Sequence, residues 1–81
     1  MKFTWPESAR NELRAVERQI AIRILHALTE YAETGAGDVK ALSGQWEGHF
    51  RLRVGDHRVI FTISKDEITI VRVRHRSESY R

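Results

Sequence analysis

Cysteine is absent from the 81 residues, and proline occurs only once. The lack of cysteine excludes disulfides and thiolate ligands for a metal. No stretch approaches the roughly 18–20 apolar residues of a membrane span, and the first residues, MKFTWPESARNELR, carry no secretory signal. We therefore expect one soluble, cytoplasmic domain over residues 1–81 that does not contact membranes. Nothing in the sequence implies a homo-oligomer.

Several catalytic signatures are missing as well. The chain has no pair of carboxylates suited to glycosidase or aspartic-protease chemistry, and no helical His-x-x-x-His. It also has no serine in a nucleophile elbow and no glycine-rich phosphate loop. We therefore expect neither a metal nor another cofactor.

Positive charge is concentrated in the second half of the chain. Residues 1–40 hold six basic and six acidic residues, whereas residues 41–81 hold eight basic and five acidic ones, so the net charge of +3 lies there. Seven of those eight are arginines: Arg51, Arg53, Arg58, Arg72, Arg74, Arg76 and Arg81. Arginine binds phosphate bidentately and stacks on bases better than lysine does. The pattern favours an anionic partner, with nucleic acid the first candidate.

Hydrophobic spacing predicts two helices and four strands. We expect strands at about residues 2–5, 49–54, 57–64 and 67–74, helices over 7–16 and about 20–32, and a connector over 38–48. Gly35 and Gly37 end the second helix, and Gly55-Asp56 fits a two-residue turn with glycine first. The large aromatic residues expected in the core are Trp5, Trp46, Phe50 and Phe61. The fold class is α+β: a small βααβββ domain with a twisted, mainly antiparallel sheet, two helices packed on one face and an open basic face.

Alternation along the central hairpin sorts its side chains onto two faces of the sheet. The two-residue turn places Arg53 opposite Arg58 and Arg51 opposite Ile60, so the three arginines share the open face. Like charges in opposite positions destabilise a sheet by roughly a few tenths of a kcal/mol or more. A phosphate bound between them reverses the sign of that interaction. The same alternation points His57 toward the covered face.

The last strand breaks its alternation. Ile70 has the phase of the residues before it, whereas Val71 and Val73 take the other phase, which indicates a β-bulge at Ile70-Val71. Without the bulge, Arg72 and Arg74 would lie on the helix-covered face, where unpaired charge is costly. With it, both arginines turn toward the open face. Because the other kinds of catalytic site are excluded, these residues favour phosphate chemistry that uses cations together with a weak acid or base.

The order of these motifs resembles that of the RelE/ParE superfamily, the toxins of bacterial and archaeal type II toxin–antitoxin pairs. The resemblance is carried by LSG at 42–44, FRLRVGDHRVIF at 50–61 and RHRSESY at 74–80, and it covers nearly the whole chain. The complete basic set and the late tyrosine favour the RelE branch. This branch implies a metal-independent mRNA interferase that acts in the ribosomal A site and inhibits translation. In the A site, a 2′-hydroxyl of the mRNA attacks the adjacent phosphate. The implied partners of the toxin are the ribosome, mRNA and a cognate antitoxin.

The resemblance also assigns roles to residues. Arg58 and Arg74 match arginines that bind the scissile phosphate and stabilise the transition state, and Tyr80 matches a tyrosine that stacks on or orients a base. Arg51 and Arg53 match basic positions that hold the mRNA, and we expect Arg76 to add to RNA binding.

The group that activates the 2′-hydroxyl stays open. Lysine is usual at the positions of Arg51 and Arg53 in the best-known member of the superfamily, and arginine, unlike lysine, does not lose its proton. The titratable candidates for acid or base are therefore His57, His75 and Tyr80.

Two alternatives to a nuclease also stay open. A ParE-like protein would poison DNA gyrase by protein contact, and ParE-like members share the RVGDHR type of hairpin. A catalytically inactive relative would bind nucleic acid in a salt-sensitive manner and cut nothing.

Overall fold

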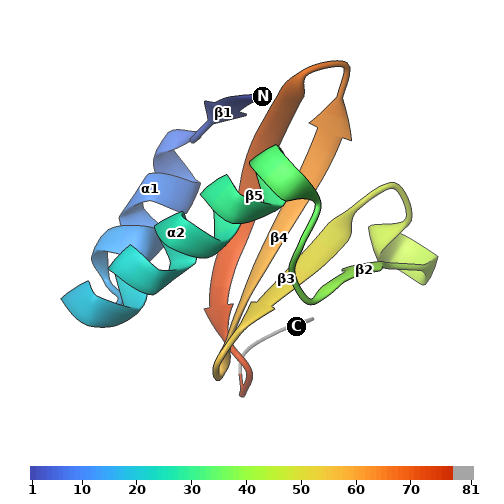
Figure 1. Cartoon of the computed structure of the whole chain (residues 1–81). Coiled ribbons are helices and arrows are strands. Elements are labelled where there is room, and N and C mark those ends of the chain that lie inside the picture. Colours follow the sequence, from blue (N-terminus) through green and yellow to red (C-terminus); the bar gives the residue numbers. More distant parts are fainter. Residues whose placement is uncertain (78–81) are drawn as a thin grey trace.

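The computed structural model describes residues 1–77 of the chain. In chain order the elements are β1 (Lys2–Thr4), α1 (Glu7–Arg14), α2 (Arg18–Thr34), β2 (Val39–Ala41), a 3₁₀ turn η1 (Gly44–Trp46), β3 (Phe50–Val54), β4 (His57–Ser64) and β5 (Glu67–His75) (Figure 1). The predicted α+β class is confirmed. Strand β2 was not predicted, because it lies in the segment that was expected to be a connector. It is three residues long and is defined by its pairing with β3 rather than by a pattern of its own.

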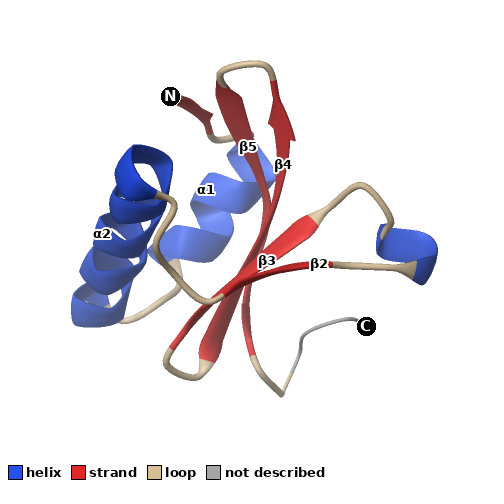
Figure 2. Cartoon of the chain, turned by 45° about the vertical axis from the view of Figure 1, so that its right-hand side comes forward, coloured by secondary structure: helices blue, strands red, loops and turns tan. Residues whose placement is uncertain are grey.

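The five strands form an open sheet in the order β1-β5-β4-β3-β2. Strand β1 runs parallel to β5, and the other neighbours are antiparallel. Both helices lie on one side of this sheet (Figure 2). No helix in residues 1–77 is long and apolar enough to cross a membrane.

A proline precedes the first helix, and a glycine ends the second. Helix α1 follows Pro6 and ends at Arg14, two residues before the predicted end, and a short turn then leads into α2. Gly35 ends α2 in the left-handed conformation, with a φ of 78°, and its N–H donates to the carbonyl of Tyr31 at 2.8 Å. Glycine adopts this conformation without the steric penalty of a Cβ, as the sequence predicted for this position.

The core lies between the helices and one face of the sheet. Its fully buried residues come from both layers: Ala9, Ile24 and Leu28 on the helices, and Leu52, Val59, Phe61, Ile68 and Ile70 on the strands. Phe61 is at its centre, in ring contact with Tyr31 and Phe50. Trp5 and Phe50 are half-buried at its margin. Trp46 is a correction, because it lies outside this core and contacts the ring of His49 instead.

The predicted bulge is present in β5. Phe61 pairs with Ile70, whereas Ile60 pairs with Arg72, so Val71 is the extra residue. Beyond the bulge, Val73 again belongs to the helix-facing core. The arginines on either side of Val73 therefore point to the opposite side of the sheet, as the change of phase predicted.

Candidate nucleic-acid interface

Six basic side chains share the face of the sheet that the helices leave open. Cross-strand partners point to the same side, and the register places them in two adjacent rows. One row is Arg53, Arg58 and Arg74, and the other is Lys40, Arg51, Ile60 and Arg72. We call the six basic residues of these rows the basic face. The predicted hairpin register, with Arg53 opposite Arg58, is confirmed, and Gly55 in the turn has a φ of 59°.

Ile60 is the apolar member of the second row. It is almost fully buried but does not belong to the helix-facing core, and its cross-strand partners are Arg51 and Arg72. Long basic side chains commonly lay their aliphatic stems along apolar surface while their charged ends reach solvent. Ile60 thus gives the basic face an apolar floor between two arginines.

Two arginines of the basic face have acidic partners. Arg51 lies 3.6 Å from a carboxylate oxygen of Asp38, and Arg74 lies 3.3 Å from one of Glu12. Arg53 and Arg58 make no side-chain hydrogen bond or ion pair within residues 1–77. Arg58 therefore has an arginine on each side and no counter-charge of its own within that range. This leaves its guanidinium donors available for an anion.

A groove of about 400 Å³ opens on the basic face. Its cationic lining consists of Lys40, Arg51, Arg53 and Arg58, and its other wall is the segment Ala41–Ser43. That segment overlaps the LSG motif at 42–44, so this motif and the hairpin motif at 50–61 line one groove. The combination of guanidinium groups with a small hydroxyl-bearing segment suits a phosphate backbone.

The remaining predicted arginines lie at the end of β5. Arg72 belongs to the basic face and donates to its neighbour's carbonyl, that of Val71, at 3.4 Å. Arg76 follows the strand, and its main-chain N–H donates to the carbonyl of Asp56 at 2.7 Å, which closes the sheet end against the hairpin turn. Tyr80, the residue predicted to stack on a base, lies outside the described residues.

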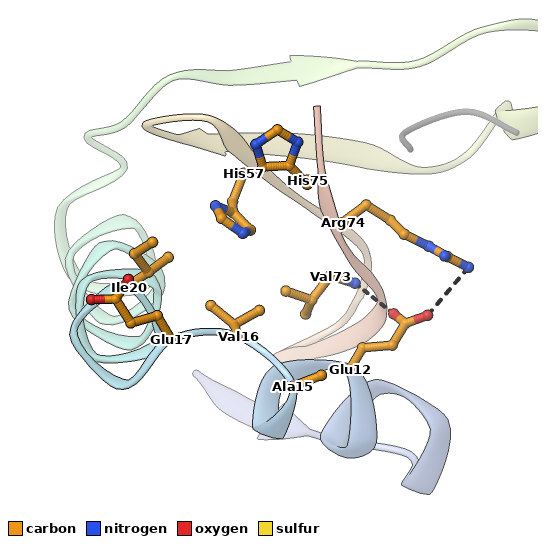
Figure 3. Close-up of a pocket in the computed structure, with 9 residues that line it drawn as sticks. All are labelled: Glu12, Ala15, Val16, Glu17, Ile20, His57, Val73, Arg74 and His75. Carbon is orange, nitrogen blue, oxygen red and sulfur yellow. Dashed lines mark hydrogen bonds and ion pairs between the residues drawn. The ribbon is translucent and has the colours of Figure 1, made fainter. Parts of the chain in front are cut away.

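The two candidate acid/base histidines are on the other side of the sheet. His57 and His75 are cross-strand partners whose ring centroids are 5.2 Å apart, and both line cavities next to Ile20 of α2. Figure 3 shows their rings on the helix side, whereas the side chain of Arg74 extends away from them. Arg74 lines one cavity with the two histidines, but its guanidinium lies away from their rings, so the structure does not place either histidine beside that guanidinium and Arg58.

One residue beside the basic face is absent from the sequence prediction. Glu12 of α1 accepts a hydrogen bond from the main-chain N–H of Val73 at 2.7 Å, and its second oxygen pairs with Arg74 (Figure 3). These contacts span about sixty residues of sequence, and the helical pattern around Glu12 gives no sign of them. No local signal in the sequence could have found it, because the contact depends on how α1 docks against the edge of β5.

Comparisons with known proteins agree with this fold. No curated protein sequence matches the chain. Among solved structures, it resembles the RelB–RelE antitoxin–toxin complex from Methanococcus jannaschii, with 25% identity and a TM-score of 0.76 over 99% of this chain and 95% of that one. A YoeB/ParE toxin from Agrobacterium tumefaciens is 17% identical, with a TM-score of 0.77 over 93% of this chain and 98% of that one. A YafQ mutant from E. coli is 9% identical, with a TM-score of 0.79 over 99% and 98%. The last two show a shared fold.

The family comparison is more specific. Residues 3–80 match the family model of the ParE toxin of type II toxin–antitoxin systems. The match covers nearly the whole chain and includes every motif on which the resemblance was based. The chain therefore belongs to this toxin family, within the RelE/ParE superfamily.

Proposed function

We propose that this toxin is an mRNA endonuclease that acts on the ribosome and thereby inhibits translation, with the basic face as its RNA-binding and catalytic surface. The observation that carries the proposal is the row of Arg53, Arg58 and Arg74, which lie directly opposite one another on three adjacent strands. Three like charges in such a row destabilise the free sheet. A phosphate bound among them would be strongly attracted, so this arrangement suits a phosphate site better than a structural one.

Arg58 and Arg74 would bind the scissile phosphate. Guanidinium groups donate several hydrogen bonds in a fixed plane and stay protonated, so they can stabilise charge that develops on the phosphate oxygens in the transition state. Arg51, Arg53 and Arg76 would bind the mRNA backbone. The groove along Lys40 and Arg51 would continue this path beyond the reacting phosphate.

The proposed reaction is an internal transfer. The 2′-oxygen bonds to the adjacent phosphorus, the bond from phosphorus to the 5′-oxygen breaks, and a cyclic 2′,3′-phosphate forms. One proton leaves the 2′-hydroxyl and one is delivered to the departing 5′-oxygen. Because His57 and His75 face the helices, we assign the handling of these protons to Tyr80. Positioned acid or base help of this kind contributes roughly 10²–10⁴-fold to rate.

Primer extension tests the proposal directly. Purified toxin is added to mRNA on programmed ribosomes and, in parallel, to the same mRNA free in solution. We expect cuts in phase with codons only on the ribosome, and no cuts with Arg58→Ala. Folded wild-type protein that cuts in neither tube would overturn the proposal.

A second candidate is inhibition of DNA gyrase by protein contact, which the match to the ParE family model favours. A supercoiling assay with purified gyrase separates the two functions. Inhibition of supercoiling without any mRNA cleavage would replace the nuclease by the gyrase poison. Because the basic face has no catalytic part in that case, Arg58→Ala would then leave nuclease-independent growth inhibition largely unchanged.

The proposed function also implies a cognate antitoxin. The solved structure from Methanococcus jannaschii is an antitoxin–toxin complex, and a YoeB–YefM toxin–antitoxin complex comes from Staphylococcus aureus. For this chain we propose a flexible acidic or amphipathic partner that covers or distorts the basic face in the cytoplasm. Such a partner would neutralise the toxin by occupying the phosphate site.

A further inference from the structure

We infer that Glu12 is a positioning residue that holds the guanidinium of Arg74 at the rim of the basic face. The inference rests on the proposed function, because it concerns how an arginine of that phosphate site is kept in place. It adds to the site a carboxylate from helix α1. This helix lies on the opposite side of the sheet from Arg53, Arg58 and Arg74, which we call the arginine row.

The fold leaves an unpaired strand edge at this place. Strand β1 pairs with β5 only as far as Thr4 opposite Thr69, so within the described residues no strand covers the outer edge of β5 beyond the bulge. An exposed edge presents unpaired N–H groups. Glu12 satisfies one of them, because its Oε1 accepts the N–H of Val73 at 2.7 Å.

This hydrogen bond fixes the carboxylate that Arg74 meets. The side chain of Glu12 is 23% exposed, and Oε2 lies 3.3 Å from a terminal nitrogen of Arg74, which is itself 34% exposed. One oxygen is thus held by the backbone and the other by the guanidinium (Figure 3). A hydrogen bond between a charged acceptor and a backbone N–H is stronger than a neutral one.

The ion pair between Glu12 and Arg74 counteracts charge repulsion within the arginine row. Arg74 is the cross-strand partner of Arg58, and repulsion between them favours rotamers that move the two guanidiniums apart. A fixed carboxylate holds Arg74 against that repulsion through one terminal nitrogen. The other N–H groups of the guanidinium remain available to a phosphate, because arginine has five donors.

The other ion pair of the basic face differs in this respect. Asp38, the partner of Arg51, is 60% exposed and lies 3.6 Å away, and its carboxylate makes no hydrogen bond to the backbone within residues 1–77. The Arg51 side chain is 11% exposed, but the carboxylate that faces it lies in solvent, where screening weakens the pair. Anchoring by the backbone therefore distinguishes Glu12 from Asp38.

The test uses Glu12→Gln, which keeps the size of the side chain and an acceptor for the N–H of Val73 but removes the charge. On ribosome-bound mRNA we expect kcat to fall about tenfold, because a displaced catalytic group lowers the rate steeply. We expect KM to stay the same or fall, because the loss of a negative charge strengthens attraction of the RNA. A fall in KM together with kcat is not the result of a simple loss of folded protein, which lowers the apparent kcat and leaves KM unchanged.

Glu17→Gln is the matched control. Glu17 is exposed in the turn between α1 and α2 and makes no ion pair within residues 1–77, and its replacement changes the net charge equally. We expect an unchanged kcat. Glu12→Asp keeps the charge and shortens the side chain by one methylene, so it should retain more of kcat than Glu12→Gln.

The decisive comparison is a double-mutant cycle. If Glu12 acts through Arg74, Glu12→Gln should change kcat by less than about twofold in an Arg74→Ala background. A full further loss in that background would overturn the inference, as would an equal loss of kcat with Glu17→Gln. A fall in kcat matched by a fall in the folded fraction, measured by circular dichroism, would do the same. Failure of the wild-type toxin to cut would instead overturn the proposed function, and this inference with it.

Discussion

Arg58 lies between two other arginines and has no counter-charge within residues 1–77. Stability alone would not favour a third cation between Arg53 and Arg74, because opposed like charges weaken a strand pair. Function and stability should therefore separate at this position.

We predict that Arg58→Gln abolishes mRNA cleavage without lowering the free energy of unfolding, and raises it by about 0.5 kcal/mol at low salt. Glutamine keeps most of the aliphatic stem and removes the charge. Urea denaturation in 50 mM and 500 mM salt measures the change, and the gain should shrink at the higher concentration because salt screens the repulsion. A loss of stability in both conditions would show that the arginine row supports the fold.

Individual residues also show which contacts could be predicted from the sequence and which could not. The register of Arg53 with Arg58 followed from a two-residue turn, because turn length fixes which residues oppose one another. The contact of Glu12 with Val73 did not follow from any local pattern, because it depends on how α1 docks against the edge of β5. Trp46 was expected in the core by its size alone, yet it lies beside His49 outside the helix-covered face.

At the scale of elements, strand β5 depends on a single inserted residue. Val71 has no partner in β4, and this shifts the phase so that Val73 enters the core while Arg74 faces outward. The sequence revealed the bulge because two apolar periodicities meet there. It did not reveal β2, because a three-residue edge strand has too few residues to show an alternation.

Deletion of Val71 should therefore leave the arginines on the open face. Ile70 and Arg72 already oppose the adjacent residues Phe61 and Ile60, so removal of Val71 gives a regular alternation in which Val73 stays in the core and Arg74 stays outside it. We expect a loss of stability below about 2 kcal/mol, from the lost side chain and the lost bulge. Circular dichroism and urea denaturation measure it.

Val71→Ala is the control for that deletion. It keeps the number of residues in β5 and hence the register, so it should cost only about 1 kcal/mol. A deletion variant that lost more than about 4 kcal/mol would contradict this, because it would mean that the fold needs the bulge itself and not only the pairing on either side of it.

At the scale of the whole molecule, the sheet separates two environments. The helices cover one face and enclose the apolar residues, whereas the other face carries Lys40 and five arginines. Helix packing on only one face is what leaves this second face available for a polyanion. The chain as a whole has a net charge of only +3, so binding to RNA should depend on this local concentration rather than on total charge.

This separation predicts the salt dependence of RNA binding. Each phosphate contact to single-stranded RNA adds about −0.7 to the slope of log K against log salt concentration. Four cations of the basic face lack a carboxylate partner within residues 1–77: Lys40, Arg53, Arg58 and Arg72. A slope of about −3 is therefore expected if all four contact phosphates. Fluorescence anisotropy with a labelled oligoribonucleotide, between 50 and 300 mM KCl, measures it.

Two variants with the same loss of charge locate the effect. Arg58→Gln should make the slope shallower by about 0.7, whereas Arg18→Gln, on the exposed surface of α2, should leave it unchanged. Equal changes in both variants would mean that RNA responds to the net charge and not to the basic face. A slope near zero in the wild-type toxin would remove the phosphate site altogether. The gyrase alternative, in which the basic face has no catalytic part, would then be the favoured function.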